Sequence, residues 1–300
     1  MRCYPNLAFN TKALGVDERS CGKDEIVCNL DSWLQTAITP GIEKLTVQLS
    51  TKSRKHYNFP CSLLAIQGSP PSTLGVALQF KKFDMSFPGV VSYTCANLLS
   101  NLRYVEALSL CSWHEIIDTP VLPIKFLHLK HLSVDLNAMI FSPTYDYCSL
   151  ISLFDASPSL ETLVLNVLQK KMLHESIVGD VSNLRQMPGH RHDSLKIWPL
   201  KTVTIIGFSS AKSVVELTCH IIENTTSLQC LTLDTTTAQP WHSCLTNHTG
   251  KCVRLHVDFL VEVGKGLLAI RTYVEPKVPS GVKLNVVEPC RRCHDLEPLS

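Results

Sequence analysis

The sequence predicts an α/β solenoid, a stack of short repeats whose strands form one mostly parallel, concave sheet and whose irregular helices and loops cover the convex side. Three observations predict it. One phrase of apolar positions recurs along the 300 residues, its copies lie 24 to 40 residues apart, and the segments between copies have the composition of short helices or polar loops. A unit of this length buries its apolar face only against its neighbours, so we expect one continuous core.

The recurring phrase is an apolar residue, two others and then alternating apolar positions, and it is clearest in SPSLETLVLNV, at Leu160, Leu163, Leu165 and Val167. Alternation with period two is typical of a short strand with one buried face. The interval between copies lies around that of leucine-rich repeats and exceeds it where insertions occur. The copies predict seven strands, centred near Val47, Leu78, Leu110, Val134, Leu165, Ile205 and Leu233.

The segments between copies have the pattern expected of the helices or loops that connect one strand of a solenoid to the next. SSAKSVVELTCHIIENTTSL has apolar residues at helical spacing, with Ser209 or Ser210 as the expected N-cap. A second short helix is expected before Pro158. The alternative is an ordinary α/β domain with leucine-rich strands, but such a domain has longer helices and usually a glycine-rich phosphate loop, and the sequence contains no such loop.

Composition and charge exclude several classes of function. The formal net charge is +2, with 28 Lys and Arg against 26 Asp and Glu, so no basic surface for nucleic acid is expected. No apolar stretch reaches the roughly 18 residues of a membrane span, and the N-terminus lacks a signal-peptide run. We therefore expect an intracellular protein, cytoplasmic or nuclear or both, that does not bind membranes and whose thirteen cysteines are free thiols.

Catalysis and cofactors are not expected. No G-x-S-x-G elbow or other nucleophile signature accompanies the cysteines and histidines. The cluster His190, His192 and Asp193 has metal-binding side chains, but it lies in the loop-like stretch NLRQMPGHRHDS and is expected to be solvated.

The stretch EPCRRCH near the end of the chain has the Cys-x-x-Cys-His spacing by which haem is attached covalently. Haem attachment needs an oxidising export route, and a zinc site at Cys290, Cys293 and His294 needs a fourth ligand from elsewhere. We expect a structural tail that follows a helix in the stretch DFLVEVGKGLLAIRTYV and a last strand at Val282, Leu284 and Val286.

The polar positions of the alternating strands form the candidate binding surface, because the leucines point into the core and the intervening side chains line the concave face. A merely solvated sheet face is the alternative for each residue. The candidate partner-binding residues are Thr46, Gln48, Gln79, Ser133, Asp135, Asn166, Thr232 and Asp234.

Four stretches carry a resemblance to a known family: MRCYPNLAFNTKALG, NLDSWLQTAITPGIEKLTV, SPSLETLVLNV and GLLAIRTYVEPKVPSGVKLNVVEPCRRCH. Together they resemble the plant, especially grass, F-box/leucine-rich-repeat (FBD-like) proteins. In that family a Trp-Arg-x-Tyr-Pro-Asn phrase closes the F-box, and here its end matches Arg2, Tyr4, Pro5 and Asn6. The resemblance therefore covers the repeat part, with the F-box missing. Members of the family also end in a Pro-Cys-x-x-Cys-His phrase without haem.

The resemblance implies a protein-interaction module similar to the substrate-recognition region of SCF-type ubiquitin ligase receptors. The partner is then a protein substrate, and a Skp adaptor and cullin are expected only if a full-length form carries the F-box. The alternatives are a binding protein or scaffold outside any ligase, or a degenerate, truncated paralogue. The expected organisation is a poorly ordered remnant at residues 1–23, a solenoid at 24–256 and a capping helix, strand and tail at 257–300.

Overall fold

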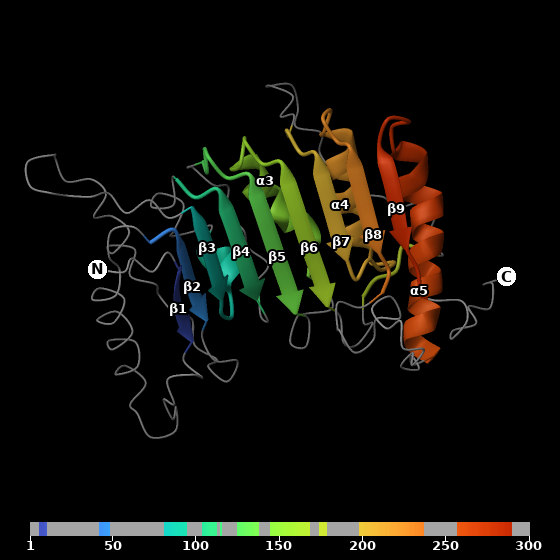
Figure 1. Cartoon of the computed structure of the whole chain (residues 1–300). Coiled ribbons are helices and arrows are strands. Elements are labelled where there is room, and N and C mark those ends of the chain that lie inside the picture. Colours follow the sequence, from blue (N-terminus) through green and yellow to red (C-terminus); the bar gives the residue numbers. More distant parts are fainter. Residues whose placement is uncertain are drawn as a thin grey trace, which may run out of the picture.

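One parallel sheet runs the length of the molecule (Figure 1). The computed structural model describes residues 6–10, 42–48, 81–94, 104–112, 115, 125–137, 145–168, 174–178, 198–236 and 257–289. In these segments nine strands follow one another in chain order, and every neighbouring pair is parallel. The strands are β1 (Asn6–Asn10), β2 (Lys44–Gln48), β3 (Lys82–Ser86), β4 (Ala107–Ser112), β5 (His131–Asn137), β6 (Thr162–Leu168), β7 (Thr202–Ile206), β8 (Cys230–Asp234) and β9 (Lys283–Val287). The predicted α/β solenoid with a parallel sheet is confirmed.

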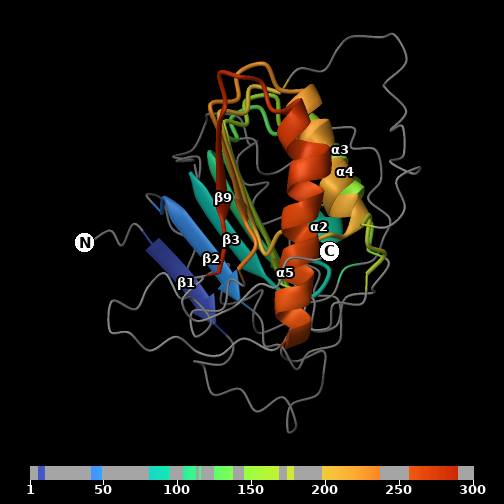
Figure 2. The same ribbon diagram turned by 90° about the vertical axis from the view of Figure 1, so that its right-hand side faces the viewer.

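The described helices lie on one side of this sheet, where they form a second layer (Figure 2). They are short, as the sequence predicts for the returns of a repeat protein, and the longest two follow β7 and precede β9. The helices are α2 (Val90–Tyr93), a 3-10 turn at Tyr147–Leu150 that continues into α3 (Ile151–Asp155), α4 (Lys212–Glu223) and α5 (Val257–Ala269), which runs on through Ile270–Val274 and Glu275–Lys277.

The core fills the space between the two layers. Two rows of strand side chains point into it, and the register aligns them from strand to strand. No member of either row is more than 2% exposed, and burial of such a side chain stabilises the fold by about 1.5–3 kcal/mol. The first row is Leu45, Phe83, Leu108, Leu132, Leu163, Val203 and Leu231, and the second is Val47, Met85, Leu110, Val134, Leu165, Ile205 and Leu233.

Six of the seven predicted strands lie where the alternating pattern places them, in β2 and β4 to β8. The strand expected near Leu78 lies outside the described residues. The place between β2 and β4 belongs to β3, in which Phe83 and Met85 take the inward positions opposite Leu45 and Val47. Phe83 and Met85 thus occupy the inward positions of this repeat.

Both ends of the sheet extend beyond those seven strands. β1 lies within the segment 1–23 and pairs with β2, so the sheet begins before the expected solenoid boundary. At the other end, α5 and β9 form where a helix and a last strand are expected, and β9 pairs with β8. The tail at Cys290, Cys293 and His294 lies outside the described residues, as does the cluster His190, His192 and Asp193.

The start of α4 differs from the expectation. Its N-cap residue is Ala211, whose side chain offers no acceptor, and not Ser209 or Ser210. Ser210 Oγ instead donates a hydrogen bond to Glu262 Oε1 on α5 at 2.7 Å, so a long-range contact takes the hydroxyl that a local cap would use. The helix before Pro158 ends at Asp155, as expected.

Candidate protein-binding surface

The side of the sheet opposite the helices presents three parallel rows of side chains, which together we call the open face. In the parallel register each row contains one residue of every strand. From β2 onward the N-terminal row is Lys44, Lys82, Ala107, His131, Thr162, Thr202, Cys230 and Lys283. The central row is Ala8, Thr46, Asp84, Ser109, Ser133, Val164, Thr204, Thr232 and Asn285. From β2 onward the C-terminal row is Gln48, Ser86, Cys111, Asp135, Asn166, Ile206, Asp234 and Val287.

Seven of the eight candidate residues lie on the open face. Thr46, Ser133 and Thr232 belong to its central row, in which most members carry a hydroxyl or another short side chain. The candidates in the C-terminal row are Gln48, Asp135, Asn166 and Asp234. Gln79 lies outside the described residues, and at its expected place β3 contributes Asp84 and Ser86. Because short side chains dominate the central row, a partner backbone can approach the sheet closely.

The basic side chains of the open face were not among the candidates chosen from the sequence. Lys44, Lys82, His131 and Lys283 all belong to the N-terminal row, because each is the first residue of its strand. Lys44 Nζ lies 2.6 Å from Asp84 Oδ2, and Thr46 donates a hydrogen bond to the same oxygen at 3.3 Å. The signal that would have found these basic residues is the position two residues before the central-row residue of each strand, on the same face.

Asp135 and Asn166 form a pair of acceptors on adjacent strands. Burial raises the pKa of Asp135 above its ordinary value, although the side chain of Asn166 donates a hydrogen bond that acts in the opposite direction. Asn166 Oδ1 is itself buried and accepts no hydrogen bond from any described group. An unsatisfied buried acceptor costs about 1–3 kcal/mol, so this place on the open face favours an incoming donor.

The same row holds a thiol and a second acid with raised pKa values. Burial raises the pKa of Cys111, and the nearby charge of Asp135 raises it further. Burial also raises the pKa of Asp234, whose Oδ1 accepts hydrogen bonds from Thr236 N at 2.7 Å and Thr236 Oγ1 at 2.6 Å. The acids of the C-terminal row are therefore partly desolvated, whereas the basic side chains of the N-terminal row are more exposed.

A ladder of alternating charges, which we call the rim ladder, runs along the edge where the strands begin. In each repeat the carbonyl of the residue before the strand accepts backbone N–H groups from the next repeat, at 2.8–3.1 Å. Lys81 Nζ lies 3.7 Å from Glu43 Oε1, and Lys201 Nζ lies 2.9 Å from Glu161 Oε2. The members of the rim ladder are Glu43, Lys81, Glu106, Lys130, Glu161 and Lys201.

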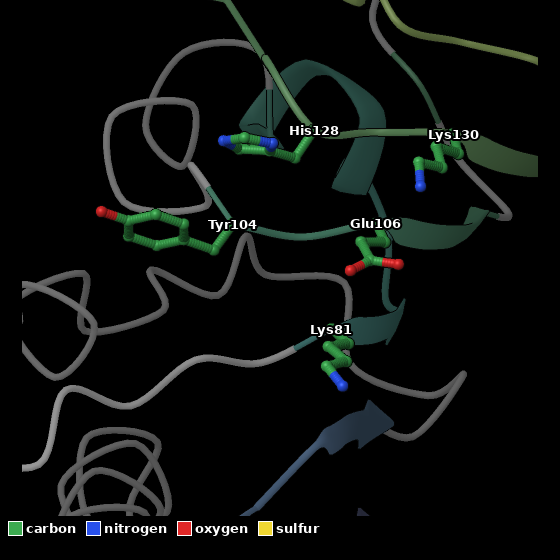
Figure 3. Close-up of a pocket in the computed structure, with 5 residues that line it drawn as sticks. All are labelled: Lys81, Tyr104, Glu106, His128 and Lys130. Carbon is green, nitrogen blue, oxygen red and sulfur yellow. The ribbon is translucent and has the colours of Figure 1, made fainter.

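A small pocket of about 150 Å³ opens on the rim, between Lys81, Tyr104, Glu106, His128 and Lys130 (Figure 3). Tyr104 and His128 stack at its edge, with ring centroids 5.9 Å apart. The carboxylate of Glu106 lies between the two lysines (Figure 3). This volume is below the 300 Å³ or more of typical small-molecule sites.

One buried cluster on the helical side combines Ser, His and Glu. His174 Nε2 lies 3.0 Å from Glu262 Oε1 and 3.3 Å from Ser210 Oγ. A catalytic triad needs the histidine between the other two groups, with one ring nitrogen toward each. Here the same nitrogen faces both, so the cluster fixes α5 to the preceding repeat without the geometry of a proton relay.

In the described part of the chain, we looked for a metal site and for a membrane-spanning helix. No three His, Cys, Asp or Glu side chains gather there as metal ligands. Within the same residues, no helix has the length and apolar character needed to cross a bilayer.

Comparison with known proteins adds one match. The family model described as the LRR domain of At1g61320/AtMIF1 matches residues 7–72 and 66–291. No curated protein and no solved structure matches the chain.

Proposed function

The chain belongs to the family of the At1g61320/AtMIF1 LRR domain, and from this premise we propose that its open face binds a protein partner. The repeat fold supports a binding role, because leucine-rich-repeat solenoids commonly use the exposed side of their sheet for recognition. The observation that carries the proposal is the acceptor pair on β5 and β6. Asp135 has a pKa raised by burial, and the neighbouring Asn166 Oδ1 is buried and has no donor among the residues that the structure describes.

We further propose that a partner supplies hydrogen-bond donors to this pair. A donor from Lys, Arg or a backbone amide would satisfy Asn166 Oδ1 and stabilise the charged form of Asp135. Because the side chains of the central row are short, an extended segment of the partner would reach both Asp135 and Asn166. In this reading the surface binds without catalysing a reaction.

The finer proposal is that the partner is a substrate of an SCF-type ubiquitin ligase and that the chain is the recognition part of an F-box receptor. Its support is the resemblance of four stretches to F-box/FBD-like proteins, including Tyr4, Pro5 and Asn6 at the position of an F-box end. Sequencing the full-length transcript tests it first. An upstream F-box, with a Skp adaptor and a cullin co-purifying, supports a receptor, whereas partners without these two proteins indicate a free interaction module.

The open-face proposal is tested by quantitative affinity capture from a plant extract. The variants Ser133→Arg and Thr232→Arg place long side chains in the central row. Thr226→Arg is the matched control, because Thr226 is exposed in the turn between α4 and β8 and lies outside the open face. We expect proteins that are captured by the wild type and by Thr226→Arg to be lost from both open-face variants. Equal recovery with all four proteins would show that the partner binds elsewhere.

A further inference from the structure

The C-terminal end of the solenoid presents a strand edge and a helix side next to each other. β9 is the last strand, and no described strand pairs with its outer side. α5 stands at the same end of the molecule, in the helical layer (Figures 1 and 2). We call β9 and the outward side of α5 together the end face.

The outward side of α5 carries an apolar stripe. Val257, Val261 and Leu268 are 68%, 41% and 41% exposed, and their spacing of four and seven residues places them on one side of the helix. The opposite side contacts the preceding repeat: a Cβ on Gly266 would lie 3.4 Å from Phe208 O, and Glu262 accepts a hydrogen bond from Ser210. The stripe therefore points away from the core, in the direction in which the repeats stack.

The edge of β9 is uncharged between Lys283 and Glu288. Lys283 N donates a hydrogen bond to Gln229 O, and Val287 O accepts one from Thr235 N, so these residues turn their backbone groups toward β8. In a parallel ladder, successive residues of a strand turn their backbone groups alternately to one side and to the other. The N–H and C=O groups of Leu284 and Val286 therefore point outward, away from β8. Val286 is also 36% exposed.

We propose that the end face binds a second copy of this chain, with the two β9 strands antiparallel about a twofold axis at Asn285. In this register Leu284 lies opposite the partner's Val286, and their outward backbone groups form four hydrogen bonds across the two symmetric pairs. Lys283 lies opposite the partner's Val287, which keeps the two lysines apart. Apolar side chains then meet on the helical side of the joined sheet.

The stripe on α5 distinguishes a second copy from other occupants. A twofold axis perpendicular to the sheet leaves both α5 helices in the same layer, so that the two stripes cover each other. An extended peptide would pair with β9 and leave the stripe in water. Head-to-tail stacking of β9 on another copy's β1 would be heterologous and open-ended, and it would produce filaments.

The test is the mass of the whole chain in solution, measured by light scattering and sedimentation at about 1–100 μM, the range that detects a micromolar dimer. Val261→Lys places a charge on the stripe, and Val286→Lys places one on the strand edge. Leu127→Lys is the matched control, because Leu127 is 54% exposed and lies in the turn before β5, far from the end face. Circular dichroism and thermal melting establish that each variant is folded.

We expect the measured mass of the wild type and of Leu127→Lys to approach twice the chain mass. The mass of Val261→Lys and of Val286→Lys should stay at that of a single chain. In the dimer, hydrogen exchange at the Leu284 and Val286 amides slows with concentration, while that at Lys283 does not change. A wild type of single-chain mass throughout, or masses that grow beyond two chains, would overturn the proposal. Loss of the dimer in Val286→Lys alone would also overturn it, because strand pairing would then occur without the helices.

Discussion

At the scale of single residues, buried carboxylates have three different roles. Glu115 accepts hydrogen bonds from Val91 N at 2.7 Å, Ser92 N at 3.2 Å and Ser92 Oγ at 2.7 Å, and so it binds the start of α2 from a distant segment, although burial raises its pKa. Glu262 connects α5 to the preceding repeat. Asp135 is partly buried on the open face, where its ionised form reduces stability. Of the three, only the last has no evident structural benefit, which favours a role in binding.

The first prediction concerns Asp135. Because burial raises its folded-state pKa, the ionised side chain disfavours folding at pH values above the unfolded pKa of about 3.9. Asp135→Asn should therefore raise the Tm at pH 7, give no gain at a pH below that value, and weaken capture of the partner.

Asp84→Asn on the same face is the control, because Asp84 is paired with Lys44 and should gain nothing. Thermal melts across pH, together with the capture assay, measure both effects. A lower Tm for Asp135→Asn at pH 7 would show that the carboxylate stabilises the fold.

The second prediction concerns Glu262. Burial raises its pKa, but the hydrogen bonds from His174 and Ser210 outweigh burial and leave the pKa below its ordinary value. A lowered folded-state pKa contributes stability that is present above the unfolded pKa of about 4.3 and is lost as pH falls through the folded value. We expect Glu262→Gln to reduce the free energy of unfolding by about 1 kcal/mol at pH 7, and the difference to narrow in acid.

Urea unfolding at several pH values measures this difference. Glu275→Gln, at an exposed position in the turn after α5, is the control and should be neutral. A difference that does not change with pH would indicate a loss of packing only.

At the scale of elements, the turn between β7 and α4 depends on one glycine. Gly207 has a φ of 75°, in the left-handed region that L-residues rarely adopt. A Cβ at this position would lie 2.0 Å from the carbonyl oxygen of Val167 on the neighbouring repeat. The turn thus brings the backbone of two repeats into contact, and only glycine fits.

The third prediction is that Gly207→Ala destabilises the protein by about 2 kcal/mol or more, from the strained φ and the collision with Val167 together. Gly281→Ala is the matched control, because no atom lies within 4 Å of its added Cβ. Urea unfolding of the two variants compares them directly. Equal stability would mean that the turn rearranges freely.

The strands could be predicted because period-two alternation marks each of them independently of its neighbours. Leu163 and Leu165, for example, alternate with Val164 and Asn166 in the sequence and point to opposite faces in β6. The position of β3 could not be predicted, because VALQFKKFDMS contains two successive alternating stretches of opposite phase and only pairing with Leu45 selects Phe83. The prediction of a serine N-cap for α4 failed for a similar reason, because Ser210 contacts Glu262, a residue distant in sequence.

At the scale of the whole molecule, the common register turns local patterns into continuous surfaces. The residues of the open face could be chosen strand by strand, but their arrangement in rows, and the acceptor pair formed by Asp135 and Asn166, depend on how neighbouring strands align. The rim ladder is a clearer case. Glu43, Lys81, Glu106, Lys130, Glu161 and Lys201 are far apart in sequence and become neighbours only because each repeat starts in register with the one before.

The last prediction tests that ladder. The hydrogen bond and charge of Lys201 lower the pKa of Glu161, and the charge of Lys130 on its other side contributes as well. Lys130→Glu would place three carboxylates in a row at Glu106, position 130 and Glu161, and like charges on adjacent strands repel. We therefore expect a lower Tm at low salt and a higher pKa of Glu161, seen by NMR titration. The loss of Tm should shrink near 1 M NaCl, where the screening length is about 3 Å.

Lys125→Glu is the matched control, because it changes the net charge equally from an exposed position beside Phe126, outside the ladder. If both variants lower the Tm to the same extent at low salt, net charge is responsible. If only Lys130→Glu does so, the alternation of charge along the rim holds successive repeats together, and the register that aligns the open face depends in part on side chains that lie outside it.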